Sequence, residues 1–299
     1  MPPSEKSNCD VRPPLASVVI PAHDEAEVIQ RCLDALFTGI QPGELDVVVA
    51  CNGCRDDTAL LARSSGYQLR VLELSSASKP AALRAGDREA LTFPRLYLDA
   101  DVVLHGSSVR KLAERLNAGA TAARPPIRYD SSRSSGPVRR YYRARSRMPA
   151  VLNSLWGAGV YGLSAAGRNR FDVFPDVVAD DLWLEHQFEP GEAEIVDCAP
   201  VVVNVPRRSR DLVHMLLRSY KGKAENRSRS GTEYEARETI PSTLHDLARV
   251  AASGRTGPID AATYAVFATG ARVALAVGPT VGTAIGAERW ERDNSSRTA

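Results

Sequence analysis

The sequence predicts an α/β protein whose mostly parallel sheet is covered by helices on both faces. In the first hundred residues, short apolar runs rich in β-branched residues alternate with segments of helical periodicity, which is the pattern of strands joined by crossover helices. The 299 residues are 43% hydrophobic and 25% charged. This is ordinary globular usage and excludes a wholly disordered or collagen-like chain.

Four buried strands and the three helices between them can be placed from this pattern. The expected strands are residues 17–20, 45–50, 69–74 and 95–99, and the expected helices are 25–37, 56–65 and 80–90. Ligands of open parallel sheets bind beyond the carboxyl ends of the strands. The segments to examine for a site are therefore 21–25, 51–55, 75–79 and 99–101.

The remainder of the chain is less regular. The glycine-rich segment 156–164 is typical of a turn that enters a strand, residues 176–188 hold an acidic pair and a short helix, and residues 201–205 resemble a strand. A basic helix is expected over 207–229. Residues 261–287 carry one charge, Arg272, and have the length of a membrane span. Because Arg272 and Pro279 interrupt this stretch, we expect two short helices packed on the domain, with membrane contact as the alternative.

Cysteine usage and the amino terminus predict a cytoplasmic protein with reduced thiols. The five cysteines are an odd number without a disulfide-framework spacing, and the first residues lack the apolar stretch of a secretory signal. The pair Cys51-x-x-Cys54 suggests zinc, but only Cys198, His186 and His23 could complete such a site, and no ligand spacing joins them. We therefore interpret these cysteines as incidental.

The strongest chemical signal is Asp99-Ala100-Asp101, directly after an expected strand. Side chains alternate along extended chain, so the two carboxylates project the same way. At the carboxyl edge of a sheet such a pair suits a hard divalent cation, Mg²⁺ or Mn²⁺, which also binds substrate phosphates. The alternative is an ordinary loop, where Asp-x-Asp also occurs.

No Gly-x-Gly-x-x-Gly motif follows the first strand, which argues against a dinucleotide-binding site. The segment Pro21-Ala22-His23-Asp24-Glu25 stands there instead. Helix capping alone would explain Asp24 and Glu25.

Five segments in order resemble family 2 of the glycosyltransferases. They are SVVIPAHDEAEVIQRCL, VVVACNGCRDDTALLA, SKPAALRAG, YLDADVVL and an acidic pair before a helix, Asp180-Asp181. The resemblance runs from about Ser17 to about Arg210. It implies the GT-A fold, a Rossmann-like αβα sandwich, here with a helical C-terminal extension.

The resemblance also implies a set of site residues. Asp181 would be the catalytic base, and Asp99 and Asp101 would hold the metal. Arg207 and Arg210 would contact the leaving phosphate. The donor would contact Pro21, Ala22, His23, Glu25, Asn52, Gly53, Lys79, Asp99, Ala100 and Asp101, and the sugar and acceptor would contact Trp156, Gly157, Gly159 and Asp180.

Three departures from the family pattern modify these expectations. Asn52 stands where the family usually has aspartate, and Ser78 and Pro80 alter the lysine motif around Lys79. Processive members carry Gln-x-x-Arg-Trp, whereas the counterpart here, residues 207–211, has no tryptophan. This difference favours a single transfer over polymerisation.

The resulting hypothesis is a metal-assisted, inverting glycosyltransferase that uses a nucleoside diphosphate sugar. The alternatives are a nucleotidyltransferase of a sugar phosphate and a non-catalytic protein that binds anionic lipid or nucleic acid. The expected organisation is a tail over 1–14, a GT-A domain over 15–210 with donor and acceptor halves that meet near 105, and an extension over 211–299.

Residues 124–147 carry eight arginines, one acid and three interleaved tyrosines. Three interpretations stay open: a solvated helix face, a basic patch for an anionic acceptor or the cytoplasmic face of a membrane, and a nucleic-acid groove. With a net charge of only +2, no nucleic-acid partner is expected.

Overall fold

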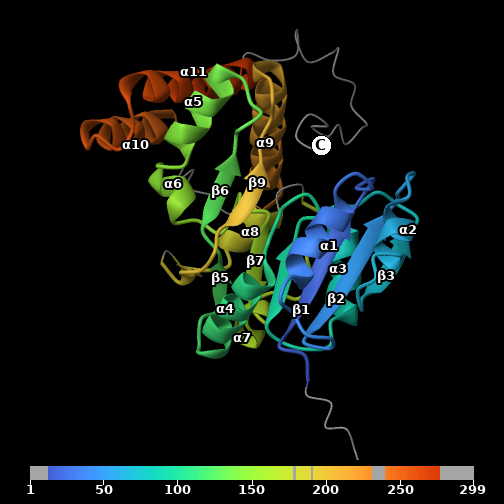
Figure 1. Ribbon diagram of the computed structural model, residues 1–299. Helices are drawn as coiled ribbons and strands as arrows, with labels where there is room; N and C mark the ends of the chain where they lie inside the picture. Colours follow the sequence, from blue (N-terminus) through green and yellow to red (C-terminus); the bar gives the residue numbers. More distant parts are fainter. Residues whose placement is uncertain (1–12, 178–179, 190, 231–239, 277–299) are drawn as a thin grey trace, which may run out of the picture.

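A seven-stranded sheet forms the centre of the computed structural model, which describes residues 13–177, 180–189, 191–230 and 240–276 (Figure 1). The strand order is β3-β2-β1-β4-β7-β5-β8. The strands of this sheet are β1 Ala16–Ala22, β2 Leu45–Asn52, β3 Arg70–Leu74, β4 Arg95–Leu98, β5 Ala122–Arg124, β7 Val160–Leu163 and β8 Ala193–Ile195.

The sheet is mostly parallel, as the sequence predicts. Strand β1 pairs in parallel with β2 and β4, and β2 with β3, whereas β7 is antiparallel to β4 and β5. The four strands predicted in the first hundred residues all form, with ends that shift by one or two residues.

Helices cover both faces because the buried side chains of each strand alternate between them. Val18 and Ile20 of β1 belong to one apolar core with helices α1, α2 and α4, while Val19 belongs to another with α3 and α8. The helices around the sheet are α1 Ile29–Phe37, α2 Thr58–Arg63, α3 Lys79–Glu89, α4 Gly106–Asn117, α7 Ala165–Arg168 and α8 Asp180–Glu185.

Two helices begin later than predicted. Helix α1 begins at Ile29 rather than Glu25, after Asp24 takes a left-handed backbone conformation with φ +47°. Helix α2 begins at Thr58 rather than Asp56, because the Asp56 carboxylate accepts hydrogen bonds from the Thr58 backbone N–H (3.1 Å) and hydroxyl (2.5 Å). An aspartate that bonds two residues ahead makes a turn rather than a helical residue.

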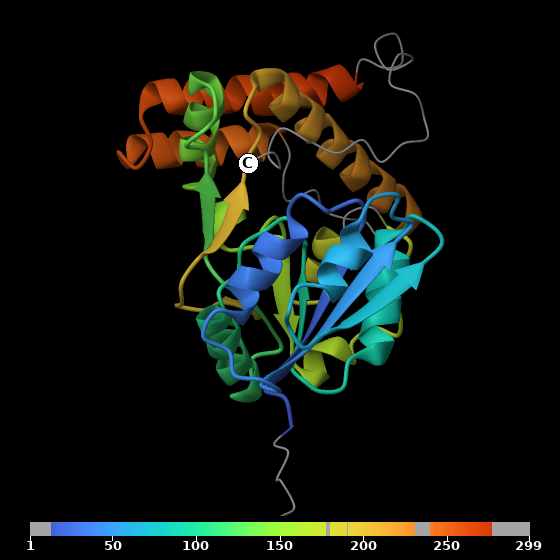
Figure 2. The same ribbon diagram turned by 45° about the vertical axis from the view of Figure 1, so that its right-hand side comes forward.

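A second layer of structure lies beyond one end of the sheet (Figures 1 and 2). It packs a separate apolar core that includes Tyr141, Leu212 and Tyr264. Its elements are the two parallel strands β6 Ile127–Asp130 and β9 Val201–Asn204 and the helices α5 Gly136–Arg145, α6 Pro149–Leu152, α9 Ser209–Ser230, α10 Ile240–Ala252 and α11 Pro258–Ala276.

In the described part of residues 261–287, the expected interruption at Arg272 does not occur. Residues 258–276 form one continuous helix, α11, while the remainder, including Pro279, lies outside the described residues. Arg272 continues the helix, and its guanidinium donates a hydrogen bond to the Thr243 hydroxyl of α10 (3.2 Å). Among the described helices, none combines the length and apolar character needed to cross a membrane.

The structure removes the stacking tyrosines Tyr141 and Tyr142 from the nucleic-acid interpretation of residues 124–147. Tyr141 and Tyr142 are buried in the second core, where Tyr141 stacks on Tyr264 with ring centroids 4.9 Å apart, so neither offers a face to a base. Arg124 is buried as well, and its guanidinium donates to the carbonyl oxygens of Pro125 (2.8 Å) and Val151 (2.7 Å). These residues hold the fold together.

Candidate functional site

A pocket opens at the carboxyl edge of the sheet, where the sequence places the site. It is narrow and partly open to solvent. Its walls come from the ends of β1 and β4, the start of α3, the segment before β7 and the start of α8. The lining residues are Pro21, Lys79, Leu83, Tyr97, Asp99, Leu155, Gly159, Val160, Tyr161, Asp180 and Asp181.

Lys79 joins two carboxylates from distant segments at the centre of this pocket. Its ammonium lies 2.8 Å from Asp99 Oδ1 and 2.9 Å from Asp180 Oδ1. Ser78 positions it, because the Ser78 hydroxyl accepts a hydrogen bond from the Ala81 backbone N–H and caps helix α3. Burial works to lower the pKa of Lys79, but the carboxylates of Asp180 and Asp99 outweigh it and raise that pKa well above its usual range.

Asp180 and Asp181 are the first two residues of helix α8, and their carboxylates accept hydrogen bonds from different donors. The Tyr161 hydroxyl donates to Asp180 Oδ2 (3.1 Å), and the Gly157 backbone N–H donates to Asp181 Oδ2 (2.8 Å). Burial, followed by the nearby charge of Asp180, raises the pKa of Asp181. The Asp181 carboxyl is therefore a stronger proton acceptor than an exposed aspartate.

Asp99 lies at the end of β4, and its backbone N–H donates to the Gly159 carbonyl (2.7 Å). Burial raises the pKa of its carboxyl to about 6, against the opposing effect of Lys79, while Asp180 and Asp101 raise it further. Asp101 is half-buried, does not line the pocket, and accepts at its backbone carbonyl a hydrogen bond from Arg31 (3.4 Å). Its charge is nevertheless close enough to act on Asp99.

This group of carboxylates suits a hard divalent cation. Asp99, Asp180 and Asp181 face the ammonium of Lys79, and burial first, then repulsion from neighbouring acids, raises the pKa values of Asp99 and Asp181. Oxygen ligands with surplus negative charge are what Mg²⁺ and Mn²⁺ prefer. The residues present therefore fit such a cation.

The glycine-rich segment before β7 is held against α8 by a residue that the sequence analysis missed. Glu185 Oε2 accepts hydrogen bonds from the backbone N–H groups of Leu155 (3.0 Å) and Trp156 (3.3 Å). The signal was its spacing, since Glu185 follows Asp181 by four residues and so shares its helix face. Tyr161, also missed, stands two residues after Gly159 and reaches the same pocket.

Gly159 has a position that only glycine fits. Its φ is +67°, and a Cβ there would lie 2.6 Å from Val102 Cγ1 and 3.4 Å from Asp99 Oδ2. Gly157 is also left-handed, with φ +80°, but a Cβ would meet only Arg145 at 3.7 Å. Trp156 is half-buried beside Arg145, whose guanidinium lies 5.5 Å from the centroid of its ring.

Asn52 joins loops rather than presenting an open amide. It is 3% exposed, its side-chain N–H donates to the Ala22 carbonyl (2.8 Å), and its oxygen accepts from the Ser78 backbone N–H (3.0 Å). Gly53 (φ +57°) packs against the backbone of Ala77, which a Cβ would approach to 2.5 Å. These contacts tie the ends of β1 and β2 to the start of α3, which holds Lys79.

Several other predicted residues do not reach this pocket. Arg207 and Arg210 lie between β9 and the first turn of α9, and Arg210 pairs with Asp211 (3.3 Å). His23, Glu25 and Ala100 are close in sequence to the lining residues Pro21 and Asp99 but do not line the pocket themselves. Glu25 is buried, and its backbone N–H donates to the Thr58 hydroxyl (2.7 Å).

Comparisons with known proteins identify the family and the fold. Residues 17–172, more than half of the chain, match the family described as glycosyl transferase family 2. A curated relative, the glycosyltransferase AglE of Haloferax volcanii, is 35% identical over 97 residues, which are 31% of this chain and 32% of the relative. The alignment thus spans about a third of the relative's length.

Solved structures share the fold across most of the chain. The mannosyltransferase PcManGT of Pyrobaculum calidifontis, in complex with GDP-Man and Mn²⁺, is 22% identical with a TM-score of 0.56 and covers 89% of this chain and 83% of its own. Glucosyl-3-phosphoglycerate synthase of Mycobacterium tuberculosis, with Mn²⁺, UDP and glucosyl-3-phosphoglycerate, is also 22% identical, with a TM-score of 0.52 and coverages of 74% and 81%. These similarities establish the fold, the GT-A glycosyltransferase fold.

Proposed function

The chain belongs to glycosyl transferase family 2, and on that premise we propose that it moves one sugar per encounter from a nucleoside diphosphate sugar to an acceptor hydroxyl, with inversion and with the help of a divalent cation. The observation that carries this proposal is the convergence of Asp99, Asp180 and Asp181 on Lys79 in one pocket. In this proposal residues 15–105 supply the donor half of the site and 106–210 the acceptor half.

Asp99, in the pocket, and Asp101, beside it, would hold the cation, and Asp180 and Asp181 would add negative charge near it. A divalent cation held there would stabilise the negative charge that develops on the leaving diphosphate, without a proton transfer. The complexes of the two neighbours support this assignment, since one holds GDP-Man and Mn²⁺ and the other UDP and Mn²⁺. Lys79 would remain beside Asp99, where its positive charge faces the donor phosphates.

Asp181 would act as the base. The Gly157 and Leu182 backbone N–H groups each donate to its carboxylate at 2.8 Å, which fixes its orientation toward the pocket. It would accept the acceptor hydroxyl proton as that oxygen bonds to the anomeric carbon and the carbon–oxygen bond to the diphosphate breaks on the opposite face. This geometry inverts the anomeric centre, and such a base typically contributes about 10²- to 10⁴-fold.

Three residues would act by positioning. Tyr161 orients Asp180, Glu185 holds the segment that carries Trp156 and Gly157, and Asn52 holds the start of α3. The proposal of a single transfer rests on residues 207–211, where the tryptophan of processive members is absent.

A thermal-shift screen tests the donor assignment. Nucleoside diphosphates and their sugars, each with and without Mn²⁺, should raise the melting temperature only in combination with the metal, because a ligand of the native state stabilises it. An absence of stabilisation by every nucleotide with Mn²⁺ would contradict the donor site.

The replacement Asp181→Asn tests the base. We expect turnover to fall about 10²- to 10⁴-fold, while the nucleotide-induced thermal shift stays at the wild-type value. Asp176→Asn is the matched control, because Asp176 is exposed and pairs with Arg84 at 2.9 Å, outside the pocket. Wild-type turnover in Asp181→Asn would refute the assigned base.

A further inference from the structure

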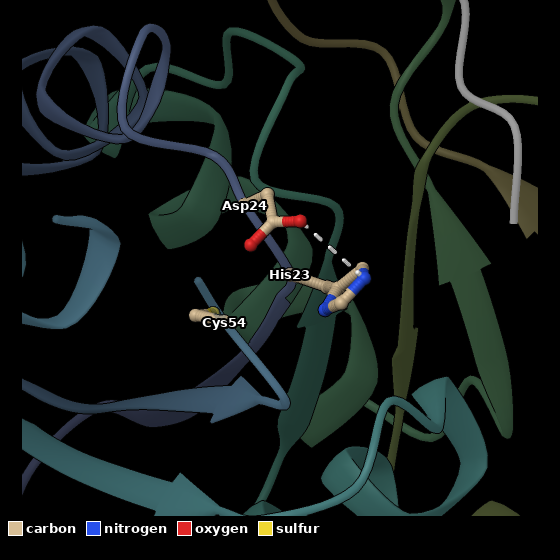
Figure 3. Close-up of side chains that lie close together, drawn as sticks. All are labelled: His23, Asp24 and Cys54. Carbon is tan, nitrogen blue, oxygen red and sulfur yellow. Dashed lines mark ion pairs between the residues drawn. The ribbon is translucent and has the colours of Figure 1, made fainter. Parts of the chain in front are cut away.

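Three side chains of metal-ligating type lie together outside the Lys79 pocket. His23 and Asp24 follow β1, Cys54 follows β2, and a ligand atom of each lies within 4.8 Å of the other two (Figure 3). The sequence analysis found no spacing that would join His23 to the cysteine pair. The parallel register supplies it, because Ala22 pairs with Cys51 at the ends of the two strands.

Hydrogen bonding assigns the His23 tautomer. Nδ1 lies 2.5 Å from the Asn52 carbonyl oxygen. A carbonyl oxygen can only accept, so Nδ1 carries the proton and, in the neutral ring, the lone pair resides on Nε2. Histidine ligands of metals almost always donate their second ring N–H in this way.

Asp24 is anchored with one oxygen toward His23. Its Oδ1 accepts a hydrogen bond from the Arg55 backbone N–H (2.6 Å), and its Oδ2 lies 3.7 Å from His23 Nε2 (Figure 3). The left-handed backbone at Asp24, with φ +47°, turns the carboxylate into this position. The half-buried Cys54 completes the group from the neighbouring strand.

We propose that the side chains of His23, Asp24 and Cys54 form a binding site for a zinc-class transition metal, separate from the proposed magnesium or manganese site. One nitrogen, one oxygen and one thiolate leave a fourth position for water, as in open tetrahedral zinc sites. The thiolate selects Zn²⁺ or Co²⁺ over Mg²⁺ and Mn²⁺.

The ligand separations are compatible with closure around an ion. Tetrahedral zinc with bonds of about 2.0–2.3 Å requires ligand atoms about 3.3–3.6 Å apart. His23 Nε2 lies 3.7 Å from Asp24 Oδ2, and one ligand atom of each of the three residues lies within 4.8 Å of the other two. Changes of about 1.5 Å or less in these separations, between half-buried residues, would therefore suffice.

Cobalt titration of the full chain tests the proposal. Co²⁺ bound to a thiolate shows a sulfur-to-metal charge-transfer absorption that carboxylate sites lack. The titration is done under a phosphine reductant and in a Cys9→Ser background, because Cys9 lies outside the described residues. We expect the absorption to saturate at one Co²⁺ per chain and to be displaced by Zn²⁺.

Variants identify the ligands. Cys54→Ser should abolish the absorption, and Cys198→Ser, a half-buried cysteine elsewhere, should retain it. His23→Gln should weaken Co²⁺ binding by about tenfold or more, and so should Asp24→Asn, which tolerates the left-handed backbone and keeps an oxygen for the Arg55 N–H. Circular dichroism and the melting temperature verify that each variant is folded.

The outcomes are separable from those of the proposed function. No absorption in the wild-type background, or its persistence in Cys54→Ser, overturns the zinc-class site, whatever the nucleotide and Mn²⁺ experiments give. Equally, a failed nucleotide screen leaves the cobalt result intact, because the proposed Mn²⁺ ligands contain no sulfur.

Discussion

Two networks of charged side chains lie on the same side of the sheet, a buried one around Asp87 and a half-buried one around Lys79. Asp87, on α3, is 5% exposed and accepts hydrogen bonds from Arg95 (2.8 Å), Tyr97 (2.5 Å) and Arg168 (2.8 and 3.0 Å). Both of its oxygens are satisfied, and two guanidiniums surround one carboxylate. The Lys79 network has the inverse composition, one ammonium among several carboxylates.

The difference shows how buried charge can serve structure or chemistry. Burial tends to raise the pKa of Asp87, but the hydrogen bonds from Arg168, Tyr97 and Arg95 outweigh it and lower that pKa. At Asp99 burial prevails over Lys79, and the pKa rises to about 6. The first network is complete without a ligand, whereas the second has surplus negative charge that a cation would neutralise.

The largest expected effect is on folding. Asp87→Asn should lower the free energy of unfolding by about 3–5 kcal/mol, because it leaves two largely buried guanidiniums without a counter-charge. Urea denaturation measures it. The exposed pair of Asp176 and Arg84 provides the control, since Asp176→Asn should change stability by less than about 0.5 kcal/mol. A loss under 1 kcal/mol in Asp87→Asn would show that this network is not a structural unit.

Removing the positive charge of Lys79 should change stability less, and the change should depend on Mn²⁺. Lys79→Met should destabilise the metal-free protein by about 1–3 kcal/mol, since Asp99 and Asp180 lose their partner. Mn²⁺ should then raise the melting temperature more than it does in wild type. Lys111→Met, which removes an exposed pair with Glu114, should show neither change. An equal Mn²⁺ response in both variants would argue against cation binding at these carboxylates.

Two glycine replacements separate backbone strain from crowding at the pocket. Gly157→Ala should cost about 1–2 kcal/mol in stability through its left-handed backbone alone. Gly159→Ala adds a 2.6 Å approach to Val102 and displaces the segment beside Asp99, so turnover should fall further than in Gly157→Ala. Steady-state kinetics and thermal denaturation of both variants measure this order. Identical turnover in the two would mean that the close approach at Gly159 does not shape the site.

The smallest expected effect is a difference in pH dependence. The raised pKa of Asp99 means that the folded state holds this proton more tightly than the unfolded state, where the pKa is near 3.8. Its contribution to stability is therefore lost as the pH rises from about 4 to about 6. The lowered pKa of Asp87 acts in the opposite sense, and its contribution is lost only as the pH falls below about 4.

Urea denaturation of wild type and Asp99→Asn between pH 4 and pH 7 measures this difference. The variant should gain stability relative to wild type as the pH rises through about 6, because it lacks the carboxyl that must ionise. A constant difference across this range would mean that Asp99 titrates as an ordinary aspartate.

Much of the site followed from position in the sequence. Asp99 directly follows a strand, Pro21 lies near the carboxyl end of another and Lys79 begins a helix. Residues at the carboxyl ends of parallel strands meet at one edge. The hydrogen-bond and packing partners of the side chains could not be predicted from the sequence. Asn52 is buried and links loops by hydrogen bonds, Arg124 is buried and donates to carbonyl oxygens, and Tyr141 is a core residue. Burial depends on contacts with segments far along the chain, which the local sequence does not show.

From the sequence alone come the strand–helix alternation, the family and the edge of the sheet where the chemistry lies, because apolar periodicity and strand ends are local properties. The folded chain alone reveals that Lys79 bridges Asp99 to Asp180, that Glu185 holds the glycine-rich segment, and that His23 meets Cys54. Each of these contacts joins residues from separate segments, and their distances depend on the register and packing of the whole sheet.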